Sequence, residues 1–408
     1  MSQADFQHIQ DFTPNQRHIV TLSEALAREL APSAAEHDRT GAFVLSHYQR
    51  LHEAGYLRLA LPKAHGGDGA SVFDLVLAQE RLAQGDAATA IGVGMLLNVL
   101  GRLAEEPTWP EPVLTKVFQT IAREGGIVNS VVTEADLGSI SRGGVPATVA
   151  KPVPGGWSIS GHKIFVTAAP ALRYLLVAVS IPPSTQAPQG EVARAIVEAP
   201  APGLRFEATW QDALSQRSGG SDDAYFDNVF VPEAFVVERT PVGVAAPPTA
   251  ANAWWLGLVA VYLGIAQASL DAATDYAHDR VPSVLGKPLA TQPHIQQWIG
   301  EMQALVIGAR AVLYDVARRW SDHPEQRANL GPQIAAAKYL VTNTACQVTD
   351  LGLRVAGGFS LTRRLTLERH FRDARGGLFQ PPQDDLALGL LGRTALAQRA
   401  PATQGVSV

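Results

Sequence analysis

The sequence contains very little cysteine, a single Cys346 among 408 residues. One thiol cannot form a disulfide within the chain, so a reducing compartment, the cytoplasm, is predicted. The first residues lack an apolar core behind a basic start, and no signal peptide is expected. The longest apolar run, Trp254–Ala266, is shorter than the roughly 20 residues that cross a bilayer. It predicts a helix buried in the protein and no membrane span.

Strong charge of either sign is also absent. The formal net charge is −5 and 17% of the residues are charged, which argues against a nucleic-acid partner. The motifs G-x-G-x-x-G after a strand, the phosphate-binding loop and G-x-S-x-G are missing, which excludes the nicotinamide, nucleotide-hydrolase and serine-hydrolase classes that depend on them. The 11 histidines are not spaced as zinc ligands, so no metal site is predicted.

Three stretches with contrasting patterns are present. Apolar residues recur at helical spacing from Arg17 to about Arg123, and short runs such as Leu175–Val179 alternate with turns between Gly126 and Arg239. Helical spacing returns over 251–278, 295–320 and 333–355, after a Pro- and Ala-rich stretch at 241–248 that predicts a linker. The second of these helices carries one apolar face, which a bundle or subunit interface would bury: Ile295, Trp298, Ile299, Met302, Val306, Ala309, Leu313 and Val316.

Several segments resemble the acyl-CoA dehydrogenase family, in matching order from about Leu51 to Leu396. The most specific are Thr133–Ser139 (TEADLGS) and Gly156–Thr167 (GWSISGHKIFVT). The resemblance implies an α+β fold with an N-terminal helical domain over residues 1–124 and a middle β-sandwich or barrel-like domain over 125–240. A C-terminal four-helix bundle is expected over 241–398, followed by a tail over 399–408.

In this family the two segments flank a flavin. Carried over to this chain, Thr133 would hydrogen-bond the isoalloxazine edge, Thr167 would approach the reducible nitrogen, and the ring of Phe165 would pack on the flavin. Ser139 belongs to the same cofactor-binding set. A flavin requires such neighbours, because its broad face is apolar and its polar edge needs hydrogen-bond partners once it is buried.

The resemblance also implies a site for the rest of the cofactor. Arg280 would neutralise the diphosphate, usually across a subunit boundary, with Gln292 in the loop that follows. Gly357 and Gly358 would admit the dinucleotide part of a neighbouring subunit's cofactor. FAD is therefore expected, with FMN as the alternative, in a homotetramer or homodimer.

The chain departs from the family at the catalytic base. Acyl-CoA dehydrogenation needs a carboxylate to remove the α proton, and the family usually supplies it as Glu. That position falls on Pro381 here, and an Arg common at an alternative position is replaced by Trp255. Gln380 and Asp384, with Asp385 beside it, are the candidate catalytic residues in this segment.

Three hypotheses follow. The first is a flavin-dependent oxidoreductase acting on an acyl-CoA or a similarly flat organic substrate, with an electron acceptor protein. The second is a two-component monooxygenase that uses O₂ and reduced flavin from a partner reductase, because residues 262–266 and 390–393 look like that branch of the superfamily. There Gln380 stands where His is common, and Gln cannot transfer a proton near neutral pH. The third is a catalytically silent relative that binds a ligand.

Overall fold

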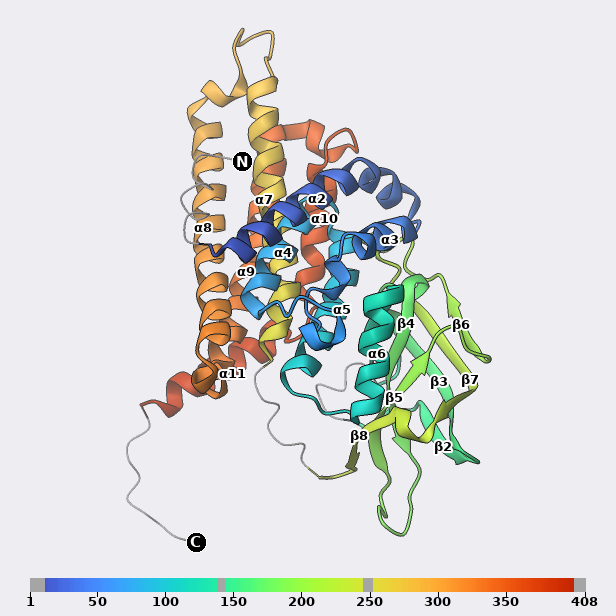
Figure 1. The fold of residues 1–408 in the computed structure, drawn as a ribbon. Helices are drawn as coiled ribbons and strands as arrows, with labels where there is room; N and C mark the ends of the chain where they lie inside the picture. The colour runs from blue at the N-terminus through green and yellow to red at the C-terminus, as the bar shows by residue number, and fades with distance from the viewer. Residues whose placement is uncertain (1–11, 138–143, 245–251, 400–408) are drawn as a thin grey trace. The chain divides into compact units, whose positions relative to one another are not determined.

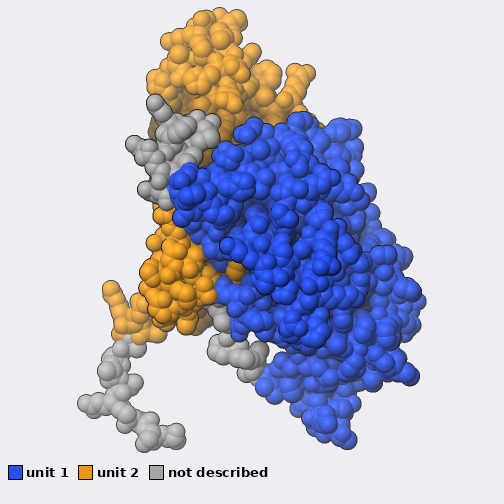
Figure 2. All heavy atoms as spheres, viewed as in Figure 1, with its two compact units in different colours: residues 1–249 blue, residues 250–408 orange. Residues whose placement is uncertain are grey.

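The computed structural model describes residues 12–137, 144–244 and 252–399. The chain divides into two compact units, residues 1–249 and 250–408, shown as a ribbon in Figure 1 and as blue and orange spheres in Figure 2. The first unit contains both the helices and the sheet that the sequence predicts as two domains. Residues 245–248 of the predicted linker and 400–408 of the predicted tail lie outside the described residues.

The first unit begins with helices whose ends are set by local capping. They are α2 (Pro14–Thr40), α3 (Leu45–Glu53), α4 (Val72–Gly85), α5 (Ala87–Glu105) and α6 (Glu111–Glu124). Thr13 and Ser71 form capping boxes that satisfy free N–H groups at the starts of α2 and α4. Gly41 ends α2 in the left-handed conformation, with φ 67°, that glycine adopts without strain. These helices confirm the predicted helical region.

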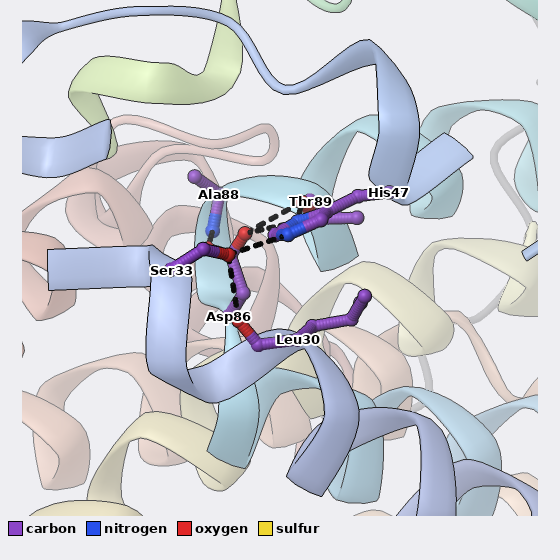
Figure 3. Close-up of polar contacts among 6 residues, drawn as sticks. All are labelled: Leu30, Ser33, His47, Asp86, Ala88 and Thr89. Carbon is purple, nitrogen blue, oxygen red and sulfur yellow. Dashed lines mark hydrogen bonds and ion pairs between the residues drawn. The ribbon is translucent and has the colours of Figure 1, made fainter. Parts of the chain in front are cut away.

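A buried polar network ties three of these helices together, as Figure 3 shows. His47 on α3 reaches Ser33 Oγ on α2 through Nε2 at 2.8 Å. Its Nδ1 lies 3.1 Å from Asp86 Oδ2 and 3.0 Å from Thr89 Oγ1. Asp86 is also the N-cap of α5, where it accepts a hydrogen bond from the N–H of Ala88 at 3.1 Å. Loss of His47 would therefore release polar partners on two other helices.

The order Ser33, His47, Asp86 matches the order of contacts in a hydrolase triad, but its setting is structural. Ser33 lies within helix α2, and its hydroxyl donates to the carbonyl of Leu30 at 3.0 Å. A nucleophilic serine instead stands on an exposed turn beside N–H groups that can stabilise an oxyanion. The network therefore serves to fix helices α2, α3 and α5.

The sheet of the first unit has eight strands in the described residues: β1 (Ile127–Val131), β2 (Val149–Val153), β3 (Gly156–Val166), β4 (Leu172–Ile181), β5 (Glu191–Glu198), β6 (Leu204–Glu207), β7 (Asp222–Pro232) and β8 (Val236–Pro241). Their order is β6-β7-β3-β2-β4-β5-β8, and β1 runs parallel to β4. The predicted run Leu175–Val179 is buried in the middle of β4. The strands confirm the predicted middle domain of β structure.

The second unit is helical. Its helices are α7 (Leu256–Asp279), α8 (Pro293–Asp322), α9 (Gly331–Ala356), α10 (Leu367–Arg375) and α11 (Asp384–Ala397), and α9 packs against the other four. Six of the eight residues predicted on one face of α8 are buried, and Trp298 and Ile299 are half-buried. The apolar pattern of α8 thus marks the face that the bundle covers.

Two helices in the described residues are long and apolar enough to cross a membrane, Ala87–Glu105 and Ala253–Asp279. Within their most apolar windows, 89% and 78% of the residues are buried in the protein. A helix that is apolar all round is typical of a protein core when it is covered in this way. The segment Trp254–Ala266 is therefore a core helix, as the sequence predicts.

Candidate functional site

The end of strand β3 presents an aromatic ring in an unusual conformation. Phe165 has φ 60°, a value that bulky residues rarely adopt, and 56% of its surface is exposed. The pairing of β3 with β7 shifts register between Lys163 and Val166, which marks a bulge that can turn a side chain to a new direction. Lys163 is fully buried while Phe165 is exposed. Strained residues of this kind concentrate at functional sites.

Trp210 stands beside this ring and was not singled out from the sequence. The two ring centroids are 5.6 Å apart at 75°, an edge-to-face arrangement. Asp222 accepts hydrogen bonds from the N–H groups of Thr209 and Trp210, and the indole N–H donates to the carbonyl of Ser215 at 3.2 Å. Trp210 lies on a loop far from the motif in sequence, so only the fold brings it to Phe165.

Two residues after the ring, Thr167 meets a second hydroxyl, that of Ser221. Thr167 is buried, and its Oγ1 is 3.0 Å from Oγ of Ser221. The carbonyl of Thr167 accepts a hydrogen bond from the side-chain amide of Asn129 at 3.0 Å. Aromatic and hydroxyl groups therefore meet at one end of β3, which is the combination that an isoalloxazine ring requires.

The predicted residue Thr133 is joined to the same strand through its backbone. Its carbonyl accepts a hydrogen bond from the N–H of Ile164 at 3.0 Å. The structure thus places the Thr133 backbone against the residue that precedes Phe165. Ser139, the fourth predicted residue of this group, lies outside the described residues.

A buried ion pair lies under these residues. Lys163 Nζ is 2.7 Å from Glu134 Oε1, and their side chains are 0% and 6% exposed. The carboxylate also accepts hydrogen bonds from Thr148 Oγ1, Thr148 N and Ala147 N. Burial alone would raise the pKa of Glu134, but the hydrogen bonds from Lys163, Thr148 and Ala147 outweigh it and lower the pKa to about 2. Burial lowers the pKa of Lys163 against the opposing effect of Glu134.

In the second unit, Arg280 follows helix α7 and lies near the two predicted glycines. Its guanidinium carbon is 5.1 Å from the ring centroid of Phe359, directly after Gly357 and Gly358. A Cβ atom added at either glycine would meet no atom within 4 Å. A cation therefore lies beside open backbone, an arrangement that suits a phosphate-bearing ligand. Gln292 stands at the far end of the loop, where its N–H donates to the carbonyl of Leu289, and the N–H of Leu289 donates to the carbonyl of Arg280.

The candidate catalytic segment lies between α10 and α11. Gln380 is half-buried there. Asp384 is held on both sides, because Lys338 Nζ is 3.0 Å from Oδ1 and the amide of Asn343 is 2.9 Å from Oδ2. The Lys338 side chain is only 2% exposed. Both oxygens of Asp384 are therefore engaged by donors from helix α9.

Gly377 fixes the start of this segment. An added Cβ would lie 2.9 Å from the ring of Tyr262 and 3.0 Å from the methyl of Thr342. The chain can therefore pass this closely over α7 and α9 only with glycine here. Across the described residues, His, Cys, Asp and Glu side chains form no group of three or more that could hold a metal ion.

Comparison with known proteins agrees with these features. Three family models match the chain. They are described as the N-terminal, middle and C-terminal domains of acyl-CoA dehydrogenase, and they match residues 13–106, 130–229 and 249–379. The chain is 39% identical to YdbM of Bacillus subtilis (strain 168), whose name assigns it to the acyl-CoA dehydrogenases, over 91% of this chain and 94% of that protein. It is 29% identical to L-evernosamine nitrososynthase of a Micromonospora species, over 91% and 87%.

A solved structure of KijD3, in complex with FMN and a dTDP-linked amino-keto sugar, has a similar fold. It superposes with a TM-score of 0.83 at 25% identity and covers 94% of both chains. The three matched regions span most of the sequence in the order that its motifs predict. The chain therefore belongs to the acyl-CoA dehydrogenase family, a family of flavin-dependent oxidoreductases.

Proposed function

We propose that this protein is a flavin-dependent monooxygenase of the acyl-CoA dehydrogenase family, which uses reduced flavin and O₂. The observation that carries the proposal is the state of the segment at residues 380–384. Pro381 has no carboxylate, and both oxygens of Asp384 are held by Lys338 and Asn343. Removal of an α proton requires a carboxylate that is free to accept it. Pro381 supplies none and Asp384 is engaged by two donors, so chemistry that needs no carboxylate at these two positions is favoured.

The cofactor is FAD, with FMN as the alternative. In the first unit, Phe165, Trp210 and Thr167 offer aromatic and hydroxyl partners for the isoalloxazine. In the second unit, Arg280 beside the open backbone of Gly357 suits the phosphate groups of a neighbouring subunit's cofactor. When bound, the flavin would supply the electrons that activate O₂. The complex of KijD3 with FMN supports a flavin in this fold.

The nitrososynthase relative supports an oxygen-adding reaction. Its name describes the formation of a nitroso group, which is an oxidation that adds oxygen to nitrogen. In this chain Gln380 would orient a substrate or an oxygen atom by hydrogen bonding, because an amide does not exchange protons near neutral pH. A proton donor would then come from the substrate or from water.

Dehydrogenation of an acyl-CoA is the second candidate. It is favoured by the 39% identity to YdbM, whose name assigns it to the acyl-CoA dehydrogenases. In that case an electron acceptor protein would take the place of the partner reductase. Asp384 would then need to leave Lys338 when substrate binds.

Anaerobic mixing separates the two candidates. Oxidised flavin on the enzyme should keep its colour when a series of acyl-CoA thioesters of different chain length is added without O₂. Reduced flavin from a separate reductase should then support incorporation of one atom of labelled O₂ into a product, tested with amines, thioethers and thioesters. Bleaching by any acyl-CoA without O₂ would contradict the monooxygenase and support the dehydrogenase.

We infer further that the protein works in the cytoplasm as a homo-oligomer, a tetramer or a dimer. The single Cys346 supports a reducing compartment. A family site in which Arg280 serves a neighbouring subunit's cofactor would require more than one copy of the chain. Light scattering on the purified protein tests this, and a monomer that retains flavin would contradict it.

A further inference from the structure

The segment of Thr133 is attached to strand β3 at three successive residues. Lys163 Nζ donates to the carbonyl of Val132 at 3.3 Å, Ile164 N donates to the carbonyl of Thr133 at 3.0 Å, and Lys163 Nζ pairs with Glu134 at 2.7 Å. Two of the three attachments depend on one ammonium group. Without the Lys163 ammonium, only one of these three contacts would remain, the backbone hydrogen bond from Ile164 to Thr133.

The same ammonium lies two residues before the exposed ring. In a regular strand the side chains at positions 163 and 165 would point to the same face of the sheet. Lys163 is 0% exposed and Phe165 is 56% exposed, so the bulge separates their directions. The position of the ring therefore depends on Lys163 remaining directed inward, toward Glu134.

A buried charge pair is a specific way to fix this geometry. An apolar pair of the same size would stabilise the fold about as well, but it would lack the directed hydrogen bonds that fix the two side chains relative to each other. Glu134 uses its carboxylate for Lys163, for the hydroxyl of Thr148 and for two backbone N–H groups. Every partner lies at a defined distance, so the pair sets a register as well as a contact.

We propose that Lys163 and Glu134 are positioning residues for the flavin, which hold Thr133 and Phe165 at the spacing that the isoalloxazine ring requires. This inference rests on the proposed flavin site at the end of β3. It adds two residues that would not touch the cofactor themselves and that act through their neighbours. Substitution of either residue should therefore change the affinity and the absorption of the bound flavin even in a variant that still folds.

The test uses the full chain and three variants, Lys163→Met, Glu134→Gln and the double variant. The dissociation constants for FAD and FMN are measured by fluorescence quenching, and the visible absorption band of the bound flavin is recorded. Each single variant should weaken flavin binding by about tenfold or more and displace the band. The double variant leaves no unpaired charge, so its melting temperature should recover while its flavin affinity should not.

Glu238→Gln provides a matched control in the same sheet. Glu238 on β8 accepts hydrogen bonds from Arg102, Thr108 and Trp109, at 2.9, 2.8 and 3.1 Å. Its substitution should lower the melting temperature but change flavin affinity less than about twofold. That contrast separates positioning from a general loss of stability.

Two results would overturn the inference alone. One is a double variant that binds flavin as tightly as the wild type, and the other is flavin affinity that follows melting temperature across all variants including Glu238→Gln. Wild-type protein that binds neither FAD nor FMN would instead overturn the proposed function, and this inference with it.

Discussion

Phe165 offers a direct test of whether backbone strain serves the flavin site. In an ordinary strand, glycine is less stable than alanine by about 0.5–1 kcal/mol, because it loses more conformational freedom on folding. At φ 60° the order should reverse, since the left-handed conformation costs a residue with a Cβ atom about 1–2 kcal/mol. Phe165→Gly should therefore be more stable than Phe165→Ala by about 0.5–1 kcal/mol. Both variants lose the ring, so both should lose flavin affinity equally.

Thermal melting and flavin titration of both variants provide the measurement. A difference of this size corresponds to about 1–4 °C in a domain of 150–250 residues. Asn228, with φ 51° and an exposed side chain on β7, is the matched control position. There glycine should again be more stable than alanine, but neither change should affect flavin binding. An alanine variant more stable than the glycine variant would refute the strain argument, and unchanged flavin affinity would refute the role of the ring.

Four further substitutions or conditions test other parts of the structure. Asp384→Asn should lower the free energy of unfolding by about 1–3 kcal/mol, because Lys338 stays buried without its anion, and adding Lys338→Met should recover most of the loss in urea denaturation. If Asp384 were instead the base, turnover would disappear while stability held. His47→Ala should cost about 2 kcal/mol in the same assay by leaving its hydrogen-bond partners unsatisfied, and a change below about 0.5 kcal/mol would contradict the network. Arg280→Ala should reduce the flavin content of the purified protein at an unchanged melting temperature, whereas full flavin content would remove the phosphate assignment. The pKa of Glu134 is lowered from 4.5 to about 2, so its stabilisation is complete above pH 4.5 and is lost as pH falls toward 2. Over that window the wild type should lose more stability than Glu134→Gln, measured by urea denaturation at each pH, and parallel pH profiles would contradict this.

The order of helices, strands and helices could be predicted because each region carries its own periodicity. The run Leu175–Val179 is apolar without interruption and lies buried in β4, as a covered strand should. On α8 the spacing of Ile295, Met302 and Val306 identifies the buried face. The local apolar pattern was sufficient to predict the buried residues of an element that packs against a single core.

The candidate site could be predicted only where a contiguous motif carries it. Thr133, Phe165 and Thr167 belong to two short segments, and the structure brings these segments together. Trp210 was missed because its approach to Phe165 depends on a loop that Asp222 holds from another strand. The ion pair of Asp384 with Lys338 joins residues on separate helices, and neither periodicity nor spacing reports such a contact.

The two units retain different parts of the family's chemistry. At the end of β3 the chain has a strained aromatic residue and a buried ion pair, and strained residues of this kind concentrate at functional sites. At residues 380–384 the resemblance places the family's Glu on Pro381, and Asp384 is bound to Lys338. The end of β3 therefore has groups that suit a flavin, whereas residues 380–384 have no carboxylate at the position of the family's base. We infer that a chain without this base still offers the flavin's own reactivity, and reaction of reduced flavin with O₂ is the chemistry that needs least from a carboxylate at this position.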